Sequence, residues 1–315
     1  MDYQKHTRLL FIQQKETWPL LAENSEGLKN VLLKTLSFGG FSFKVQYNAK
    51  RITSSAAKVD KETIAARPCF LCQANRPMEQ SQVLFEGSYD ILCNPFPIFQ
   101  EHFTIAGLNH IPQEIGNSFG QYLDISKALH ELVVFYNAPK CGASAPDHLH
   151  FQAGNLGFLP IESEYDNLRN RYGKELFNTP AISVVAIDDG LRRMVVLESD
   201  DKLSLESGFK PIYQFMKDLV SGEEPNLNIL GWFSGQWRII IFPRDKHRPW
   251  QYFAEGDENI LLSPASVDLG GTLITPLEKD FHKISASDVA DIMNQVCLPP
   301  ETFEELCSFI KKSLK

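Results

Sequence analysis

The chain has 315 residues, of which 43% are hydrophobic and 22% charged, and its formal net charge is −8 at pH 7. Such an acidic chain is not expected to bind nucleic acid in general, because it lacks the basic surface that offsets phosphate charge. Six cysteines with one close pair do not form a disulfide framework, and no stretch reaches the roughly 18 apolar residues that cross a bilayer, so we expect a cytoplasmic protein without membrane contact.

The first half of the sequence alternates in ways that predict strands and one helix. Residues 41–47 show a strand pattern, and residues 89–94 and 102–106 read as two strands of an antiparallel hairpin. Apolar positions from Phe119 to Val133 follow Ser118 at helical spacing, which predicts an amphipathic helix leading into a loop at Asn137.

Residues 147–153, Asp-His-Leu-His-Phe-Gln-Ala, carry the most informative pattern. On a strand, alternate side chains share a face, so His148, His150 and Gln152 would face one space while Leu149 and Phe151 face the core. The preceding residues 137–146 are turn formers and small residues, which let backbone amides approach an anion. The alternative is a pair of partly buried structural histidines.

This run resembles the signature of the histidine-triad (HIT) superfamily, in the branch with His-x-His-x-Gln. That branch contains galactose-1-phosphate uridylyltransferase, diadenosine tetraphosphate phosphorylase and the GDP-hexose phosphorylases, and the wording is most similar to the last. The resemblance implies an α+β fold, with an antiparallel sheet and flanking helices in two HIT-like halves. It also implies nucleotidyl transfer through a covalent nucleotidyl-histidine, with His150 as the nucleophile.

Two further segments extend the resemblance to GDP-hexose phosphorylases. Residues 46–51 are similar to their Gln-x-Asn-x-x-Arg stretch near the nucleotide, and residues 94–102 to their Asn-x-x-Pro-Ile-x-x-x-His hairpin. The loop before the motif departs from the uridylyltransferases, with one residue more between Ser144 and His148. The expected catalytic residues are His150, Gln152 and His148. The expected substrate-binding residues are Gln46, Asn48, Arg51, Asn94, His102, Lys140 and Ser144.

The pair Cys69 and Cys72 has several readings. With His110 downstream and His148 in the motif, a tetrahedral Cys2His2 zinc set can be proposed. The pair is unlike the GDP-hexose phosphorylases but similar to the uridylyltransferases, and the resemblance to them implies a structural zinc. Two core cysteines and a redox pair are the alternatives.

The second half looks like another α+β unit without a histidine motif. Strands are predicted at residues 181–187, 193–197 and 237–242, and helices at residues 210–220 and 300–314. We place the boundary at residue 175, which gives a catalytic half of residues 1–175 and a degenerate half of residues 176–315. The loop 243–249 carries four potentially cationic side chains that either contact substrate or form an exposed charged turn. Gly270 and Gly271 mark a close backbone approach or a simple turn.

The predicted function is that of a nucleotidyltransferase or phosphorylase. Its donor would be a nucleotide sugar or a dinucleoside polyphosphate, and its acceptor phosphate or a sugar 1-phosphate. A neutral amide at Gln152 cannot shuttle protons near neutral pH, which favours transfer over hydrolysis. A hydrolase and a catalytically silent nucleotide- or zinc-binding module are the alternatives. The base, the sugar and the oligomeric state stay open.

Overall fold

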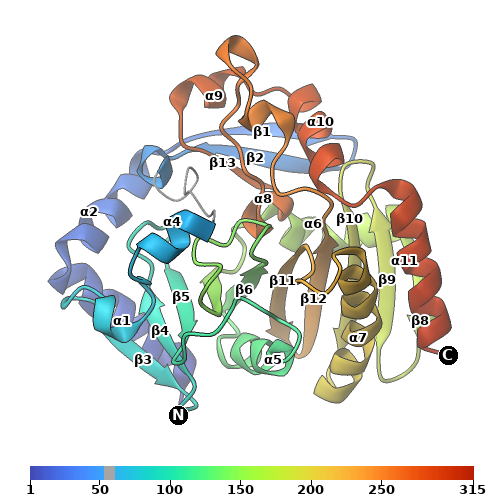
Figure 1. Ribbon diagram of the computed structural model, residues 1–315, viewed down its shortest axis with the longest axis horizontal. Coiled ribbons are helices and arrows are strands. Elements are labelled where there is room, and N and C mark those ends of the chain that lie inside the picture. Colours follow the sequence, from blue (N-terminus) through green and yellow to red (C-terminus); the bar gives the residue numbers. More distant parts are fainter. Residues whose placement is uncertain (53–60) are drawn as a thin grey trace.

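A ten-stranded sheet forms the framework of the computed structural model, which describes residues 1–52 and 61–315 (Figure 1). Every pair of neighbouring strands in this sheet is antiparallel. The predicted α+β class, an antiparallel sheet with flanking helices, is therefore confirmed. In spatial order the strands are β3 (Gln82–Phe85), β4 (Tyr89–Cys93), β5 (His102–Gly107), β7 (His150–Asn155), β6 (Leu132–Asn137), β11 (Leu227–Ser234), β12 (Gln236–Pro243), β10 (Arg193–Ser199), β9 (Ser183–Asp188) and β8 (Gly173–Asn178).

A smaller sheet joins distant parts of the chain. It consists of β1 (Leu32–Phe38), β2 (Phe41–Tyr47) and β13 (Thr272–Thr275), and β13 runs parallel to β2. The turn into β13 contains Gly271, which has φ +100°, and a Cβ there would lie 3.1 Å from Pro160. The predicted close backbone approach is confirmed, since only glycine tolerates both conditions.

Helices cover both faces of the large sheet. Because neighbouring residues of a strand point to opposite faces, Ile239 and Ile241 of β12 enter one apolar core, and Ile240 and Phe242 enter the other. The α-helices are α1 (Tyr3–Thr17), α2 (Pro19–Gly27), α4 (Lys61–Ala66), α5 (Phe119–Ala128), α6 (Pro160–Tyr172), α7 (Lys202–Leu219), α8 (Ser266–Leu269), α9 (Glu278–Lys283), α10 (Ala286–Val296) and α11 (Pro300–Ser313). Short 3₁₀ helices occupy Leu28–Asn30, Ala49–Arg51, Gln73–Asn75, Trp250–Tyr252 and Gly256–Glu258.

The predicted elements agree with these bounds to within two residues, except at two helices and at the strand of the histidine motif, which begins only at His150, so that His148 lies before it. The helix after Ser118 ends at Ala128, and Leu132 and Val133, which we expected in it, begin β6. Both faces of β6 are buried, so its residues form a continuous apolar run that periodicity alone does not separate from a helix. The helix predicted from residue 210 begins at Lys202 and contains Pro211.

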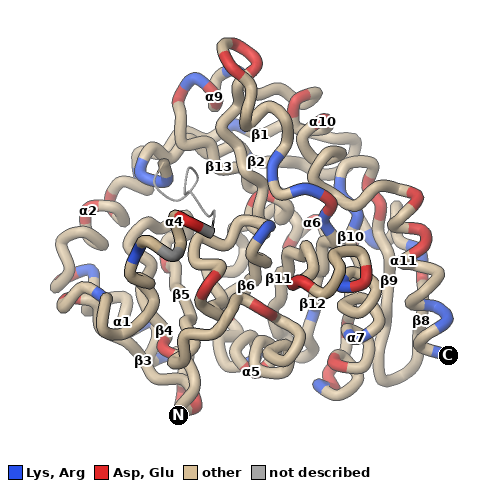
Figure 2. The backbone as a smooth tube through the Cα atoms, viewed as in Figure 1, with Lys and Arg blue, Asp and Glu red and all other residues tan. Residues whose placement is uncertain are grey.

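Charges of both signs are interspersed along the backbone (Figure 2). In the described ranges, none of the helices combines the length and the apolar character that a bilayer-spanning helix needs.

Candidate active site and metal centre

His150 begins β7, near the middle of the large sheet, and only 3% of its surface is exposed. Leu149 and Phe151 enter the apolar core on the opposite side, as the alternation predicted. His150 and Gln152 line a cavity of about 450 Å³. His148 lies two residues earlier, before the strand begins, and it contacts two cysteines instead. The three side chains therefore do not share one space.

Hydrogen bonding fixes the tautomer of His150. Its Nδ1 lies 2.8 Å from the carbonyl oxygen of His148, and since a carbonyl only accepts, Nδ1 carries the proton. Nε2 is then the unprotonated nitrogen. Burial lowers the pKa of His150 to about 4, so the imidazole is neutral near pH 7. A neutral imidazole with a free Nε2 lone pair can act as a nucleophile.

His102 of β5 orients the Gln152 amide. The backbone N–H of Ile98 donates to Nδ1 of His102, so the proton of this ring is on Nε2. That N–H donates to Oε1 of Gln152 over 3.1 Å, which leaves the amide NH2 group as the end of Gln152 available to a ligand. Burial, reinforced by the charge of Arg51, lowers the pKa of His102 to about 3, so this orientation persists at neutral pH.

The side chain of Gln113, a residue that the sequence analysis did not single out, makes the hydrogen bonds with the His150 main chain that a neighbouring strand would otherwise make. Its Oε1 accepts from the His150 N–H over 2.7 Å, and its Nε2 donates to the carbonyl oxygens of His150 and Asn137. Pairing between β6 and β7 ends at Phe135 and Gln152, so without Gln113 these main-chain groups would have no ladder partner. One buried glutamine among ordinary loop residues gives no signal in the sequence.

The cavity of about 450 Å³ beside His150, which is the larger of two neighbouring cavities, has apolar walls. Among its lining residues are Trp18, Phe70, Leu71, Pro95 and Phe96, contributed by segments far apart in the sequence. Its volume lies within the range of about 300–1,000 Å³ that is typical of small-molecule sites. Flat apolar walls beside a nucleophile suit a planar base, and the sequence analysis did not identify any of these residues.

A second cavity, of about 110 Å³, adjoins the first and is polar. The two share Asn94, Ser144 and Gln152 in their linings. Arg51 also lines the smaller cavity, and its Nη1 donates to the carbonyl oxygen of Phe96. Burial lowers the pKa of Arg51 to about 10, which leaves the side chain cationic near pH 7.

The other predicted substrate-binding residues lie in three different situations. Asn94 is oriented by two hydrogen bonds, to Thr104 and from the Phe96 N–H. Gln46 and Asn48 are buried and are not among the lining residues of either cavity, and the Asn48 amide donates to the Pro97 carbonyl. Lys140 is not among the lining residues of either cavity and pairs with Glu223 at the surface. The structure therefore brings Arg51, Asn94, His102 and Ser144 together with Gln152, and it leaves Lys140 apart.

The loop after β12 is only partly an exposed charged turn, because Lys246 is exposed whereas Arg244, His247 and Arg248 are not. Arg244 is 1% exposed and donates to the Val296 and Pro264 carbonyls and to Asn228. His247 and Arg248 line the smaller cavity. Burial, with the two neighbouring arginines, lowers the pKa of His247 to about 4. The second half of the chain thus contributes side chains to the candidate site.

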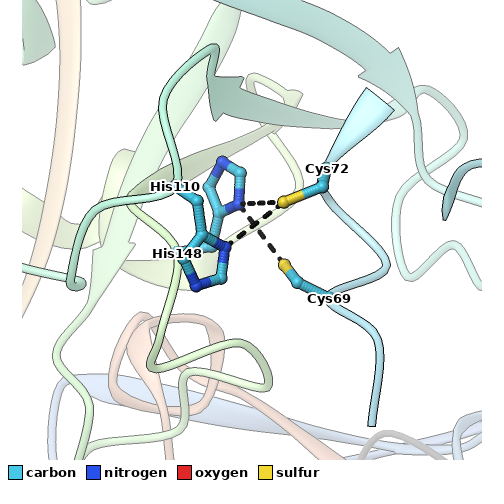
Figure 3. A group of neighbouring side chains, drawn as sticks. All are labelled: Cys69, Cys72, His110 and His148. Carbon is cyan, nitrogen blue, oxygen red and sulfur yellow. Dashed lines mark hydrogen bonds between the residues drawn. The ribbon is translucent and has the colours of Figure 1, made fainter. Parts of the chain in front are cut away.

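Cys69, Cys72, His110 and His148 form a compact cluster beside β7 (Figure 3). Their four ligand atoms lie within 4.8 Å of one another, and the closest, Cys72 Sγ and His110 Nδ1, are 3.2 Å apart. Zinc–ligand bonds of about 2.0–2.3 Å place tetrahedral ligands about 3.3–3.8 Å apart. The cluster has the donor atoms and nearly the spacing that a metal ion requires.

The protonation of His148 also fits metal binding. Its Nε2 donates to the Gly107 carbonyl oxygen over 2.7 Å, so Nδ1, which faces Cys69 at 3.3 Å, carries a lone pair. Metal-bound histidines commonly make this second bond to a carbonyl. Because the His148 carbonyl in turn accepts from His150, the cluster is connected to the proposed nucleophile by one peptide unit.

Two family models match the chain. One describes a domain of unknown function (DUF4922) and matches residues 10–155, and the other is the GDPGP1-like C-terminal domain and matches residues 178–315. No curated protein matches the sequence.

Solved structures of yeast Ap4A phosphorylase Apa2 are similar in fold. The complex with Ap4A is 17% identical with a TM-score of 0.59, over 91% of this chain and 98% of Apa2. The complex with AMP has the same identity and TM-score over 89% and 97% of the two chains. A further Apa2 structure is 16% identical with a TM-score of 0.61, over 89% and 96%. At this identity the likeness establishes the shared fold.

Proposed function

We propose that this protein is a nucleotidyltransferase of the phosphorylase type. Its donor is a nucleotide sugar or a dinucleoside polyphosphate, and the transferred nucleoside monophosphate is held covalently on His150. The observation that carries the proposal is the tautomer of His150, whose Nδ1–H is donated to the His148 carbonyl so that Nε2 is the reactive nitrogen.

The reaction has two steps. Nε2 of His150 attacks the α-phosphorus of the donor, and a sugar phosphate or a nucleotide leaves. Phosphate or a sugar 1-phosphate then takes the nucleotidyl group from His150. The Gln152 amide, oriented by His102, donates to a non-bridging phosphate oxygen and stabilises the charge that grows there.

The similar proteins point to the same class of reaction. Yeast Apa2 is an Ap4A phosphorylase with structures in complex with AMP and with Ap4A. The match of residues 178–315 to the GDPGP1-like C-terminal domain is consistent with the resemblance of the first half to GDP-hexose phosphorylases. Apolar walls around the larger cavity suit any base, so both donor classes belong in the test.

Intact-mass spectrometry tests the proposal. The protein is incubated briefly, without phosphate, with GDP-, UDP- and ADP-sugars and with a diadenosine polyphosphate. We expect a nucleoside monophosphate adduct with one donor, absent in His150→Ala, present in His130→Ala, which replaces an exposed histidine, and discharged by phosphate or a sugar 1-phosphate. An adduct that water discharges as fast as phosphate does would indicate a hydrolase. Nucleotide binding without any adduct would indicate a silent module.

We also infer that Cys69, Cys72, His110 and His148 hold a structural Zn²⁺. Two thiolates and two imidazoles are a preferred zinc set, and the ion would hold the strand that presents His150. Metal analysis should find zinc in equimolar amount in the wild type and in Cys93→Ser, which replaces a buried cysteine outside the cluster. Cys72→Ser should lose the zinc and melt at a lower temperature. A zinc-free wild type that melts at the same temperature as Cys72→Ser would exclude this role.

The division into halves of residues 1–175 and 176–315 is a proposal of the same kind. What supports it is a repeated order, in which α5, β6 and β7 in the first half correspond to α7, β11 and β12 in the second. β6 and β11 are neighbours in the sheet, so the two halves would meet there.

A further inference from the structure

Glu224 lies in the loop of residues 220–226 that joins α7 to β11, and it lines neither of the two cavities beside His150. Its carboxylate nevertheless reaches the segment that supports the main chain of His150. We propose that Glu224 is a positioning residue for the reaction, which acts through Tyr136 and the segment 113–115 to hold the nucleophile in place. The inference rests on the proposed function and adds to it a residue that contacts no substrate.

The Glu224 carboxylate holds the segment 113–115 at both of its ends. Oε1 accepts the backbone N–H of Ile115 over 2.8 Å. The same oxygen lies 2.7 Å from the Tyr136 hydroxyl, and that hydroxyl lies 3.1 Å from the carbonyl oxygen of Gln113. The single hydroxyl hydrogen of Tyr136 therefore faces two acceptors, as in a three-centre hydrogen bond. One carboxylate oxygen thus fixes Ile115 directly and Gln113 through Tyr136.

Tyr213 of α7 orients the second oxygen of the same carboxylate. Its hydroxyl donates to Oε2 of Glu224 over 2.8 Å. Its ring lies so close to Gly116 that a Cβ there would be 2.7 Å from the ring carbon Cζ, a contact that only glycine avoids. The chain from residue 113 to residue 116 is therefore held by Glu224, Tyr136 and Tyr213, which belong to three different elements.

Gln113 transmits this support to the nucleophile. Its side chain forms hydrogen bonds with both the N–H and the carbonyl of His150. Gln113 and Tyr136 are both completely buried, so water cannot replace these bonds if the segment shifts. Since a misplacement of about 1 Å can slow a reaction by about 100-fold, a carboxylate that contacts no substrate can still affect the attack by His150.

The alternative is that Glu224 only attaches the loop 220–226 to the rest of the protein. Glu198 of β10 offers a matched comparison, because it is a buried glutamate that also accepts from a buried tyrosine, Tyr165, over 3.0 Å. Its side-chain donors lie on α6 and β12 and not in the segment 113–115. Loss of either glutamate–tyrosine bond should lower stability, whereas only loss of the bond at Glu224 should slow the reaction.

Rates of adduct formation test the proposal. Wild type, Glu224→Ala, Glu224→Gln, Tyr136→Phe and the control Tyr165→Phe are mixed with increasing amounts of the donor that gives an adduct with the wild type, and the adduct is followed by rapid-quench mass spectrometry. We expect Glu224→Ala and Tyr136→Phe to lower the rate at saturating donor by about tenfold. The donor concentration for half-maximal rate should change by less than about twofold, because neither residue lines a cavity. Glu224→Gln should recover most of the rate, since an amide oxygen accepts the same hydrogen bonds, and Tyr165→Phe should match the wild type.

Amide hydrogen exchange is a second readout, which does not depend on the reaction. In Glu224→Ala the amides of Ile115 and His150 should exchange about tenfold faster or more, whereas Tyr165→Phe should leave them unchanged. Melting temperatures show whether each variant is folded, and Tyr136→Phe replaces Glu224→Ala if the latter is not.

A wild-type rate in folded Glu224→Ala, or equal slowing in Tyr136→Phe and Tyr165→Phe, would overturn the proposal. If the wild type forms no adduct, the proposed function fails. Faster exchange at His150 in Glu224→Ala would then still support the positioning role, and unchanged exchange would overturn it.

Discussion

Two helix–strand–strand units meet at the centre of the large sheet, and they differ in how their strands are joined. β11 and β12 turn at Gly235 and pair over their full length, from Leu227 with Pro243 to Ser234 with Gln236. β6 and β7 are connected by residues 138–149 and pair only as far as Phe135 with Gln152. The same framework therefore supports a closed ladder in one unit and an open one in the other.

The open ladder is where the candidate chemistry lies. Because β6 and β7 separate, the connecting loop can place Ser144 beside Gln152. The N–H and carbonyl of His150 then have no partner in β6, and the side chain of Gln113 forms hydrogen bonds with both. The closed unit satisfies its main chain by itself. Function on a shared fold depends on such loops between strands. The main-chain hydrogen bonds that β6 and β7 lose where they separate are replaced here by those of the Gln113 side chain.

Removing the Gln113 side chain should produce the largest effect, because it deletes the hydrogen bonds that support the main chain of the open unit at His150. Gln113→Ala leaves the N–H and carbonyl of His150 and the carbonyl of Asn137 without their partner, at about 1–3 kcal/mol each. We expect a loss of about 3 kcal/mol or more in the free energy of unfolding, and adduct formation slower by about 10- to 100-fold. Denaturant unfolding and rapid-quench mass spectrometry measure the two.

Gln214→Ala on α7 is the control for that change, since its amide donates to the exposed side chain of Asp218. It should alter the unfolding free energy by less than about 0.5 kcal/mol. Wild-type adduct formation in Gln113→Ala would show that Gln113 does not position His150.

Acidification should have the next largest effect on the open unit, because His102 is buried beside β7. Its pKa is about 3 in the folded protein, whereas the unfolded chain takes up a proton below about pH 6.5. The contribution of His102 to the free energy of unfolding is therefore constant above pH 6.5. Below that pH it falls by about 1.4 kcal/mol per pH unit, which amounts to about 2 kcal/mol at pH 5. His102→Gln should remove this part of the slope. An unchanged slope would mean that His102 is protonated in the folded state.

Straining the closed turn should affect stability alone. Gly235 has φ +76°, and a Cβ there meets nothing within 4 Å, so Gly235→Ala adds backbone strain of about 1 kcal/mol without a clash. Thermal unfolding should detect this loss, while the rate of adduct formation stays at the wild-type value. A slower rate would contradict the view that the closed unit serves as framework.

Replacing Lys140 should have the smallest effect, although it lies in the open loop. Its ion pair with Glu223 is at the surface, where such pairs contribute about 0–1 kcal/mol. Lys140→Gln should leave donor affinity and phosphate dependence unchanged in discharge assays. A marked rise in the phosphate requirement would return Lys140 to the substrate-binding set.

Local pattern predicted the parts of the molecule that depend on near neighbours in the sequence. The alternation of residues 147–153 placed Leu149 and Phe151 in the core, and the Cys-x-x-Cys pair led to the metal cluster. β6 was mistaken for the end of a helix because a strand buried on both faces has no alternation. Trp18, Phe70 and Phe96 could not be foreseen, because only the tertiary fold brings them to one wall.

Pairing of β2 with β13 has a consequence for synthesis of the protein on the ribosome. Tyr47 and Thr272 are 225 residues apart. At about 5–20 residues per second, roughly 11–45 s pass before β13 emerges. Until then β1 and β2 are a two-stranded hairpin, which is marginally stable by itself. Arg51, just after β2, and Arg248, late in the chain, can then define the smaller cavity together only near the end of translation.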